Sequence, residues 1–464
     1  MTSLSRQLAQ WVAHLRYEDL PPPVIDRVKG VTLHCLSSIL LGSRTKPARD
    51  AHDLINEEEA GVQNGATIMV YGGKVTRGGA AFVNSEMAFS GGKWDTFRML
   101  MHPGTSVIPG AFAAAEATGA SGKEFITAVA AAYEVMERMA ADVIPTLMAR
   151  GFHASPVFGI FGSAIAIAKL FKLDEEQTNS AIALCVSMAG GNLEGARSGG
   201  RALREGAAVR NAMMAVALAR QGHVGGETTL EGEAGFYHAF VGNNRGELTY
   251  SFDGKIKTDL AAIAKGLGSE WLMLETHYRI YSISGYNIAH VELTAKLCKD
   301  RDIRYEDIDR IEALVNWLET QYPSPAFPVR REDQIHKPGS TSYYLACAAV
   351  TRDFPMLREW APQTASAGDP PEALELLKRV TIIPTHEMTL FGPRITIYLK
   401  NGKSHTVQGT GREFIWDFDE QANRIRPITS GLPIPAPQFE AIIEGCRNLD
   451  QQKRADALVK LMLK

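Results

Sequence analysis

The stretch that decides the fold is Val157–Leu170, VFGIFGSAIAIAKL. Asn179–Met188 and Leu203–Gln221 have the same character, with small and apolar residues on nearly every side of a helix. A helix that is apolar all round is buried, because it has no polar face to present to water. These segments therefore predict a central helical bundle wrapped by further helices.

Working outward from this centre, the chain from Leu4 to about Lys265 is typical of one helix after another. The box Ser121-Gly-Lys-Glu124 is a helix start, in which the serine hydroxyl and the glutamate carboxylate cap each other's backbone N–H groups. Glycines are expected to end two of the helices. The other helices predicted here are Ile25–Leu41, Val107–Thr118 and a helix from Ser121 to about Val143.

The pattern changes after Gly266-Leu-Gly268. Strands are predicted where β-branched residues gather, and Asn401-Gly402 is a strong hairpin signal at the end of one of them. The expected strands are Val380–Ile383, Arg394–Leu399 and Ile308–Leu318, and the expected helices are Val291–Lys299 and Thr341–Thr351. The fold class is then mostly α. A large all-helical bundle domain comes from N- and C-terminal segments (1–268 and 406–464), and a smaller α+β domain (269–405) is inserted between them.

Composition excludes several classes of protein. The 464 residues include 49 Lys+Arg and 52 Asp+Glu, a formal net charge of −3, so the basic excess of a nucleic-acid binder is absent. No apolar run reaches the length of a membrane span, and the N-terminus lacks the apolar core of a secretory signal. The 5 cysteines are scattered and lack CxxC spacing. We expect a cytoplasmic, reduced protein that holds no metal and binds neither nucleic acid nor membrane.

Polar residues set into apolar helical sequence are the candidates for chemistry, since the chain has no P-loop, Rossmann fingerprint, HExxH or GxSxG motif. His102 precedes a proline and is expected at a turn just before a helix, where anions bind well. Each cluster alone also has an ordinary structural explanation as a helix cap or a solvated helix start. The four clusters are Trp94–Arg98 with Met101–Gly104, Gly151–His153, Gly199–Gly206 and His277–Tyr281.

Taken in order, these clusters resemble the MmgE/PrpD family, which includes 2-methylcitrate dehydratase, cis-aconitate decarboxylase and iminodisuccinate epimerase. The resemblance covers essentially the whole chain. The motifs that carry it besides the four clusters are Leu20-Pro21, Leu40-Leu41-Gly42, Ala80–Asn84, Val157-Phe158-Gly159, Ala215–Gly222 and Ser340–Ala346.

The resemblance implies a two-domain homodimer with a site between the domains and with no metal or organic cofactor. It implies proton transfer at carbon on a small anionic carboxylate. Thr96 and His102 match the threonine and histidine of the family's D-x-D-D-T…H-P motif, Asp95 matches its last aspartate, and His153 matches the second catalytic histidine. The implied substrate-binding residues are Asp95, Thr96, Arg201, Arg204, Arg279 and Tyr281.

The chain also departs from the family's pattern. Gly92 and Trp94 stand where two acidic residues are usual, and arginines stand at two usual lysine positions. Arginine holds a carboxylate with a bidentate fork but does not shuttle protons, because its pKa exceeds about 12. His102 and His153 are then the groups able to exchange protons near neutral pH. The other departures are Phe89 for a histidine, His34 for an aspartate, and Arg201 and Arg279 as the two arginines.

Three functions remain open at this point. The first is a dehydratase-like lyase acting on a small di- or tricarboxylate. The second is an epimerase or isomerase of a polycarboxylate, which needs two proton-exchanging groups on opposite faces of one carbon. The third is a non-catalytic anion-binding scaffold, favoured by the lost acids and disfavoured by the two retained histidines.

Overall fold

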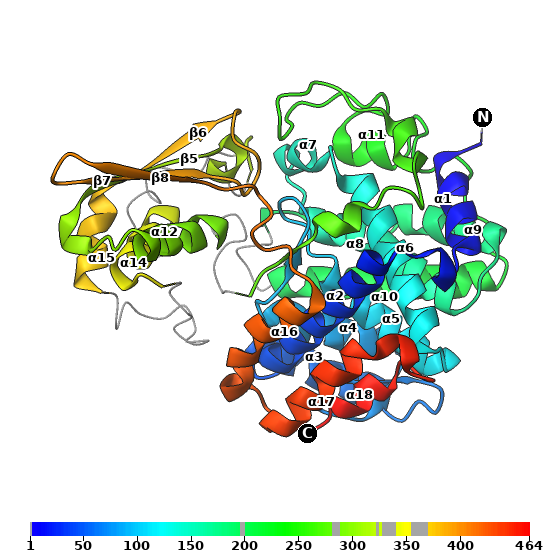
Figure 1. The fold of residues 1–464 in the computed structure, drawn as a ribbon. Coiled ribbons are helices and arrows are strands. Elements are labelled where there is room, and N and C mark those ends of the chain that lie inside the picture. Colours follow the sequence, from blue (N-terminus) through cyan, green and yellow to red (C-terminus); the bar gives the residue numbers. More distant parts are fainter. Residues whose placement is uncertain (1, 195–199, 281–287, 322–323, 327–339, 354–369) are drawn as a thin grey trace. The chain divides into compact units, whose positions relative to one another are not determined.

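The computed structural model describes residues 2–194, 200–280, 288–321, 324–326, 340–353 and 370–464, with the side chains of 201, 202 and 430 outside the description (Figure 1). The chain divides into two compact units. The first comprises Met1–Leu248, Lys257–Ile280 and Trp416–Lys464, and the second comprises Thr249–Ile256 and Tyr281–Ile415. The first is built of helices and the second mixes helices with a sheet, which confirms the predicted fold class.

Helix α8 (Ala154–Leu170) lies at the centre of the first unit, and Lys169 is its one residue that is not buried. Its neighbours α5, α6, α9 and α10 pack around it, so the bundle predicted from VFGIFGSAIAIAKL is present (Figure 1). The other helices of this unit are α1 (Leu4–His14), α2 (Pro22–Gly42), α3 (Lys46–Glu59), α4 (Arg77–Ser90), α5 (Gly104–Thr118), α6 (Gly122–Ala140), α7 (Ile144–Ala149), α9 (Glu175–Val186), α10 (Gly200–Arg220), α11 (Phe236–Val241), α16 (Phe418–Ile425), α17 (Ala436–Arg447) and α18 (Ala457–Leu461).

The expectation of continuous helices up to about Lys265 is wrong after α10. Residues 221–280 contain α11, short 3-10 turns and one two-residue strand. The reason is visible in the sequence: glycines are frequent between Gly222 and Gly246, and they leave no regular apolar stripe that a bundle could bury.

The second unit is a four-stranded sheet with the order β6-β5-β7-β8. Strand β5 runs parallel to β6 and antiparallel to β7, and β7 and β8 form the hairpin predicted from Asn401-Gly402. Helices α12, α14 and α15 lie along one face of the sheet (Figure 1). The elements are α12 (Ile288–Asp300), β5 (Ile308–Asn316), α14 (Thr341–Thr351), α15 (Pro371–Leu376), β6 (Val380–Thr385), β7 (Arg394–Leu399) and β8 (Ser404–Gln408).

Strand β5 ends at Asn316, two residues earlier than predicted, because the Asn316 side chain starts a new turn. Its oxygen accepts from the backbone N–H of Leu318 at 3.1 Å, and its amide donates to the carbonyls of Phe252 and Met388. A side chain that satisfies backbone groups in this way competes with continuation of the ladder.

Among the residues that the structure describes, every helix is too short or too polar to cross a bilayer.

Close packing of α2 against α4 gives a test of the helical unit. A Cβ atom on Gly42 would lie 1.8 Å from the Met87 carbonyl oxygen, so we expect Gly42→Ala to lower the free energy of unfolding by about 3 kcal/mol. Gly190→Ala is the matched control, since a Cβ atom there meets nothing within 4 Å, and its effect should stay under about 0.5 kcal/mol. Urea unfolding measures both variants; an equal effect of the two would contradict the packing.

Candidate active site

Two short strands join the first and the fourth polar cluster. Strand β3 (Asp95–Thr96) pairs antiparallel with β4 (His277–Tyr278), with Asp95 opposite Tyr278. The backbone N–H of Arg279 continues the ladder by donating to the Trp94 carbonyl at 3.0 Å. Residues far apart in the sequence therefore lie side by side within the helical unit.

The segment that carries Arg279 is held to the bundle by buried hydrogen bonds. Arg27 of α2 donates to the Thr276 carbonyl at 2.5 Å, and the Thr276 hydroxyl donates to Glu137 of α6 at 2.6 Å. Both partner helices belong to the same unit, so the position of Arg279 is set by the bundle itself.

His102 is fixed by its Nδ1 atom, which lies 3.0 Å from the Asp95 carbonyl oxygen and 3.2 Å from the Thr96 hydroxyl. A carbonyl oxygen only accepts, so Nδ1 carries the hydrogen in this contact. In the neutral imidazole, Nε2 is then the nitrogen with the lone pair, and it is the atom able to take up a proton.

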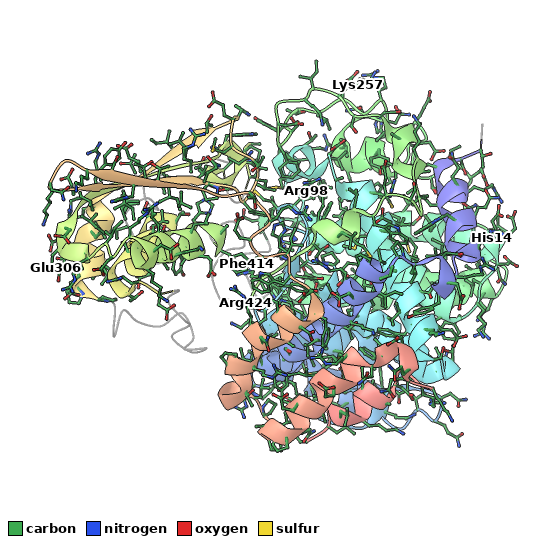
Figure 2. The ribbon with its side chains drawn as sticks, viewed as in Figure 1. His14, Arg98, Lys257, Glu306, Phe414 and Arg424 are labelled. Carbon is green, nitrogen blue, oxygen red and sulfur yellow. The ribbon has the colours of Figure 1, made fainter. Side chains whose placement is uncertain are left out.

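Hydrogen bonds link His102 and the turn before it to α8, the helix that begins directly after His153. The His102 N–H donates to the Ser155 hydroxyl at 2.7 Å, and the Ser155 N–H donates to the Leu100 carbonyl at 2.9 Å. Arg98 and Leu100 adopt left-handed backbone angles, with φ of 50° and 59°, which non-glycine residues seldom do. Arg98, labelled in Figure 2, also pairs with Glu275 at 2.9 Å.

The Asp95 carboxyl group lies at the start of α5. It accepts from the Gly104 N–H at 3.0 Å and from the Tyr133 hydroxyl at 2.5 Å. Burial raises the pKa of this carboxyl to about 6, although both hydrogen bonds act in the opposite direction. The side chain of Asp95 therefore anchors the helix, while its backbone holds His102.

His153 is the residue that precedes the first turn of α8, and its N–H donates to the Gly191 carbonyl at 2.9 Å. The centre of its ring lies 6.3 Å from that of His102. Its Nδ1 atom lies 4.0 Å from Oε1 of Glu205 on α10. The two histidines predicted to exchange protons are both buried and lie next to each other.

The third cluster reaches His153 through α10. Arg204 donates to the Asn192 carbonyl at 3.1 Å, in the segment that also binds the His153 backbone, and its Nη2 atom lies 3.9 Å from Glu205. The side chain of Arg201 and the whole of Tyr281 lie outside the described residues, so their predicted roles stay predictions.

Trp94, at a position where the resemblance implies an acidic residue, contacts both a histidine and an arginine of the site. Its ring stacks on Phe89 at 4.6 Å and contacts the His102 ring at 4.5 Å. The guanidinium carbon of Arg279 lies 4.4 Å from the centre of the same ring, a cation–π contact. One aromatic side chain therefore links an arginine to a candidate proton-exchanging histidine.

The sequence analysis missed Lys93, which is 1% exposed. Burial, together with the nearby charge of Arg279, lowers the pKa of the Lys93 amine to about 7. It also missed Glu86, and it included Glu205 in the Gly199–Gly206 cluster without a role of its own; both are fully buried. For Glu86 the available signal was a charged residue inside the apolar stretch Ala80–Phe89, whereas Lys93 follows Gly91-Gly92 and has no such signal.

His34, the other departure from the family pattern, is neutral. Its Nδ1 atom accepts from the Gln421 amide at 2.7 Å. Burial lowers the pKa of its imidazole to about 3, and the charges of Lys93 and Arg279 act in the same direction. His34 is therefore a buried hydrogen-bond acceptor. Within the described ranges, no three His, Cys, Asp or Glu side chains are grouped so as to hold a metal ion.

Comparison with known proteins identifies the family of the chain. The sequence signature of the MmgE/PrpD N-terminal domain matches residues 6–249, which is more than half of the chain, and the chain belongs to the MmgE/PrpD family. It is 23% identical to the cis-aconitate decarboxylase-like protein oryM of Aspergillus oryzae over 424 residues, which cover 87% of this chain and 85% of the relative. It is 25% identical to a cis-aconitate decarboxylase of Aspergillus terreus over 308 residues, which cover 64% of this chain and 60% of that relative.

The buried Lys93 predicts a specific dependence of stability on pH. Its pKa is about 7 in the folded protein against 10.5 for an ordinary lysine, so between these values the unfolded chain binds more protons. The free energy of unfolding therefore rises with pH in this window. Lys93→Met removes this contribution to the pH dependence. We expect the gain in free energy of unfolding of the variant over wild type to be about 2 kcal/mol larger at pH 6 than at pH 9.

Urea unfolding of wild type and variant at the two pH values measures this difference. Lys46→Met is the control, since the Lys46 side chain is 77% exposed and should give the same small effect at both. A pH-independent effect of Lys93→Met would show that the Lys93 amine is not desolvated.

Proposed function

We propose that this protein is a lyase that acts on a small di- or tricarboxylate by proton transfer at carbon. The observation that carries the proposal is the pair of buried imidazoles whose centres lie 6.3 Å apart. The relatives named as cis-aconitate decarboxylases support the lyase class and make tricarboxylates the first substrates to test.

His102 is suited to the role of base in this mechanism. Its Nδ1–H is held by the Asp95 carbonyl, so Nε2 presents the lone pair that removes a proton from a carbon next to a carboxylate. His153 lies close enough to serve the same substrate as the acid, protonating either a leaving hydroxyl group or the carbon from which CO2 departs. In elimination of water, His102 receives the proton from carbon and His153 gives its proton to the departing hydroxyl group. In loss of CO2, the electrons of the broken C–C bond take up the His153 proton at carbon, and no proton is removed from carbon.

The cations suit the binding of the substrate. Arg279 lies on the Trp94 ring and Arg204 lies beside the segment that carries His153, so guanidinium groups are present near both imidazoles. A guanidinium group binds a carboxylate through two parallel hydrogen bonds, and its fixed charge stabilises the enolate-like charge that forms when the proton is removed.

Epimerisation is the second candidate, because both proposed proton-exchanging groups are histidines. Two alternately protonated imidazoles can act on opposite faces of one carbon, whereas elimination needs a leaving group as well. Incubation in D2O with a panel of polycarboxylates, followed by NMR, separates these cases. We expect deuterium at the substrate carbon together with a new alkene product; deuterium exchange with inversion and no alkene would identify an epimerase instead.

Substitution of the two histidines tests the proposed mechanism. We expect His102→Asn and His153→Asn each to lower turnover by about 10²–10⁴-fold while a carboxylate inhibitor still binds, because asparagine keeps a hydrogen bond but takes up no proton near neutral pH. Activity assays and inhibitor titration measure the two effects, with thermal melts to verify folding. Near-normal turnover in both variants would exclude the two-histidine mechanism.

Arg279→Met tests the clamp separately. Methionine keeps apolar contact with the Trp94 ring and loses the charge, so we expect roughly ten- to hundred-fold weaker binding of a dicarboxylate. The inhibitor titration of the preceding experiment measures it. Equal binding of a neutral analogue and a dicarboxylate by the wild type would show that the arginines do not bind carboxylates.

We also infer that the protein forms a homodimer. Leu203 and Met214 of α10 are 52% and 48% exposed, so this helix presents apolar side chains at its surface. Light scattering should give about twice the chain mass of 50.6 kDa at micromolar concentration. A mass near that of one chain would contradict the dimer.

A further inference from the structure

Two buried glutamates lie on the packed helices α4 and α10, and one of them, Glu205, lies beside His153. Glu86 belongs to α4 and Glu205 to α10, and both side chains are 0% exposed. Oε1 of Glu86 would lie 2.7 Å from a Cβ atom on Gly206, so its carboxyl group rests against the α10 backbone directly after Glu205. Two carboxyl groups in one buried place do not both carry a charge easily, because the charges repel and neither is hydrated.

The surroundings of the two groups differ, and the difference decides which one carries the charge. Glu205 Oε1 has His153 Nδ1 at 4.0 Å and Arg204 Nη2 at 3.9 Å, so it faces two groups that can be positive. Burial and the charge of Glu205 raise the pKa of Glu86 well above its usual range, while the Gly206 N–H and Arg204 act weakly in the opposite direction. These surroundings favour the proton on Glu86 and the negative charge on Glu205.

We propose that Glu86 and Glu205 share one proton and so place a single negative charge beside Nδ1 of His153, which makes His153 the acid of the reaction and leaves His102 as the base. The assignment of acid and base rests on the proposed function, whereas the shared proton does not. Neither glutamate touches the substrate, so both are positioning residues that act through His153.

The protons balance in this scheme. In elimination of water, His153 begins as an imidazolium, donates its Nε2 proton to the departing hydroxyl group, and becomes neutral with Nδ1–H on the side of Glu205. His102 begins neutral and receives the substrate proton on Nε2. Exchange with water between turnovers returns both histidines to their starting states.

This cycle requires one negative charge on the pair Glu86 and Glu205, rather than none or two. With no charge at Glu205, the buried imidazolium of His153 would lose the carboxylate beside it and would release its proton more easily. With two charges, the pair would be costly to bury and would hold the His153 proton too tightly for transfer. Arg204 and Glu205 are the described charged groups that act on Glu86, and both lie on α10.

The test follows the His153 imidazole directly, by ¹⁵N NMR of histidine-labelled protein during a pH titration. Glu205→Gln removes the charge, so His153 should become half-protonated at a pH lower by about one unit or more. Glu86→Gln imitates the protonated carboxyl group, so the His153 titration should move by less than about 0.3 unit. Equal shifts in the two variants, or none in either, would overturn the proposal.

A second measurement keeps the test valid if Glu205→Gln does not fold. In wild-type protein with ¹³C-labelled glutamate, a protonated carboxyl signal should persist above pH 7 and disappear in Glu86→Gln. Glu137 is the internal reference, since burial also raises the pKa of its carboxyl group well above the usual range and its signal should remain in the variant. Absence of a Glu86-dependent signal in the wild type would overturn the shared proton.

Kinetics then separate this proposal from the proposed function. With a substrate found in the D2O experiment, Glu205→Gln should lower kcat about ten- to hundred-fold with KM nearly unchanged, and the alkaline limb of the kcat profile should move to lower pH. A loss confined to KM would overturn the role of the pair as support for the acid. If the NMR results hold but no polycarboxylate is turned over, the proposed function is wrong and the carboxyl pair stands.

Discussion

The site depends on the burial of Asp95. Its carboxyl group accepts from the first N–H of α5 and from Tyr133 on α6, its carbonyl oxygen holds the His102 ring, and its backbone pairs with Tyr278. Removing a charged carboxylate from water costs free energy, so burial favours the protonated form and raises the pKa of Asp95 to about 6. The two hydrogen bonds to the carboxyl group, from α5 and α6, offset part of that cost and hold these two helices at the strand that carries Asp95. The position of the candidate base is thus a consequence of where one acid is buried.

The candidate base also belongs to a continuous line of contacts that joins an arginine to a glutamate. Arg279 lies on the Trp94 ring, Trp94 contacts His102, His102 adjoins His153, and His153 faces Glu205. Arg279 thus lies at one end of this line and the Glu205 carboxyl group at the other, with the two imidazoles between them. This arrangement gives two chemically identical side chains different surroundings. Different surroundings are what an acid and a base of the same residue type require.

Some of this arrangement was predictable from the sequence and some was not. The buried helix α8 and the hairpin at Asn401-Gly402 follow from local patterns, because apolar periodicity and turn chemistry act over a few residues. The pairing of Asp95-Thr96 with His277-Tyr278 has no such signal: two-residue strands are too short for a pattern, and their contact is set by the packing of α2 and α6. Glu86 was readable as a charge in an apolar helix, but only the fold shows that its carboxyl group rests against α10 directly after Glu205 and that Glu205 lies beside His153.

The departures from the family pattern make sense as one electrostatic change. An acid at position 94 would add a negative charge beside a cation at position 279, whereas the Trp94 ring holds Arg279 by its π face and adds no charge. Arginine is better suited than lysine to this contact because its planar guanidinium stacks on the ring while its edge still presents N–H donors. The ring contact therefore places the Arg279 guanidinium near His102, the histidine that is proposed to generate negative charge on the substrate.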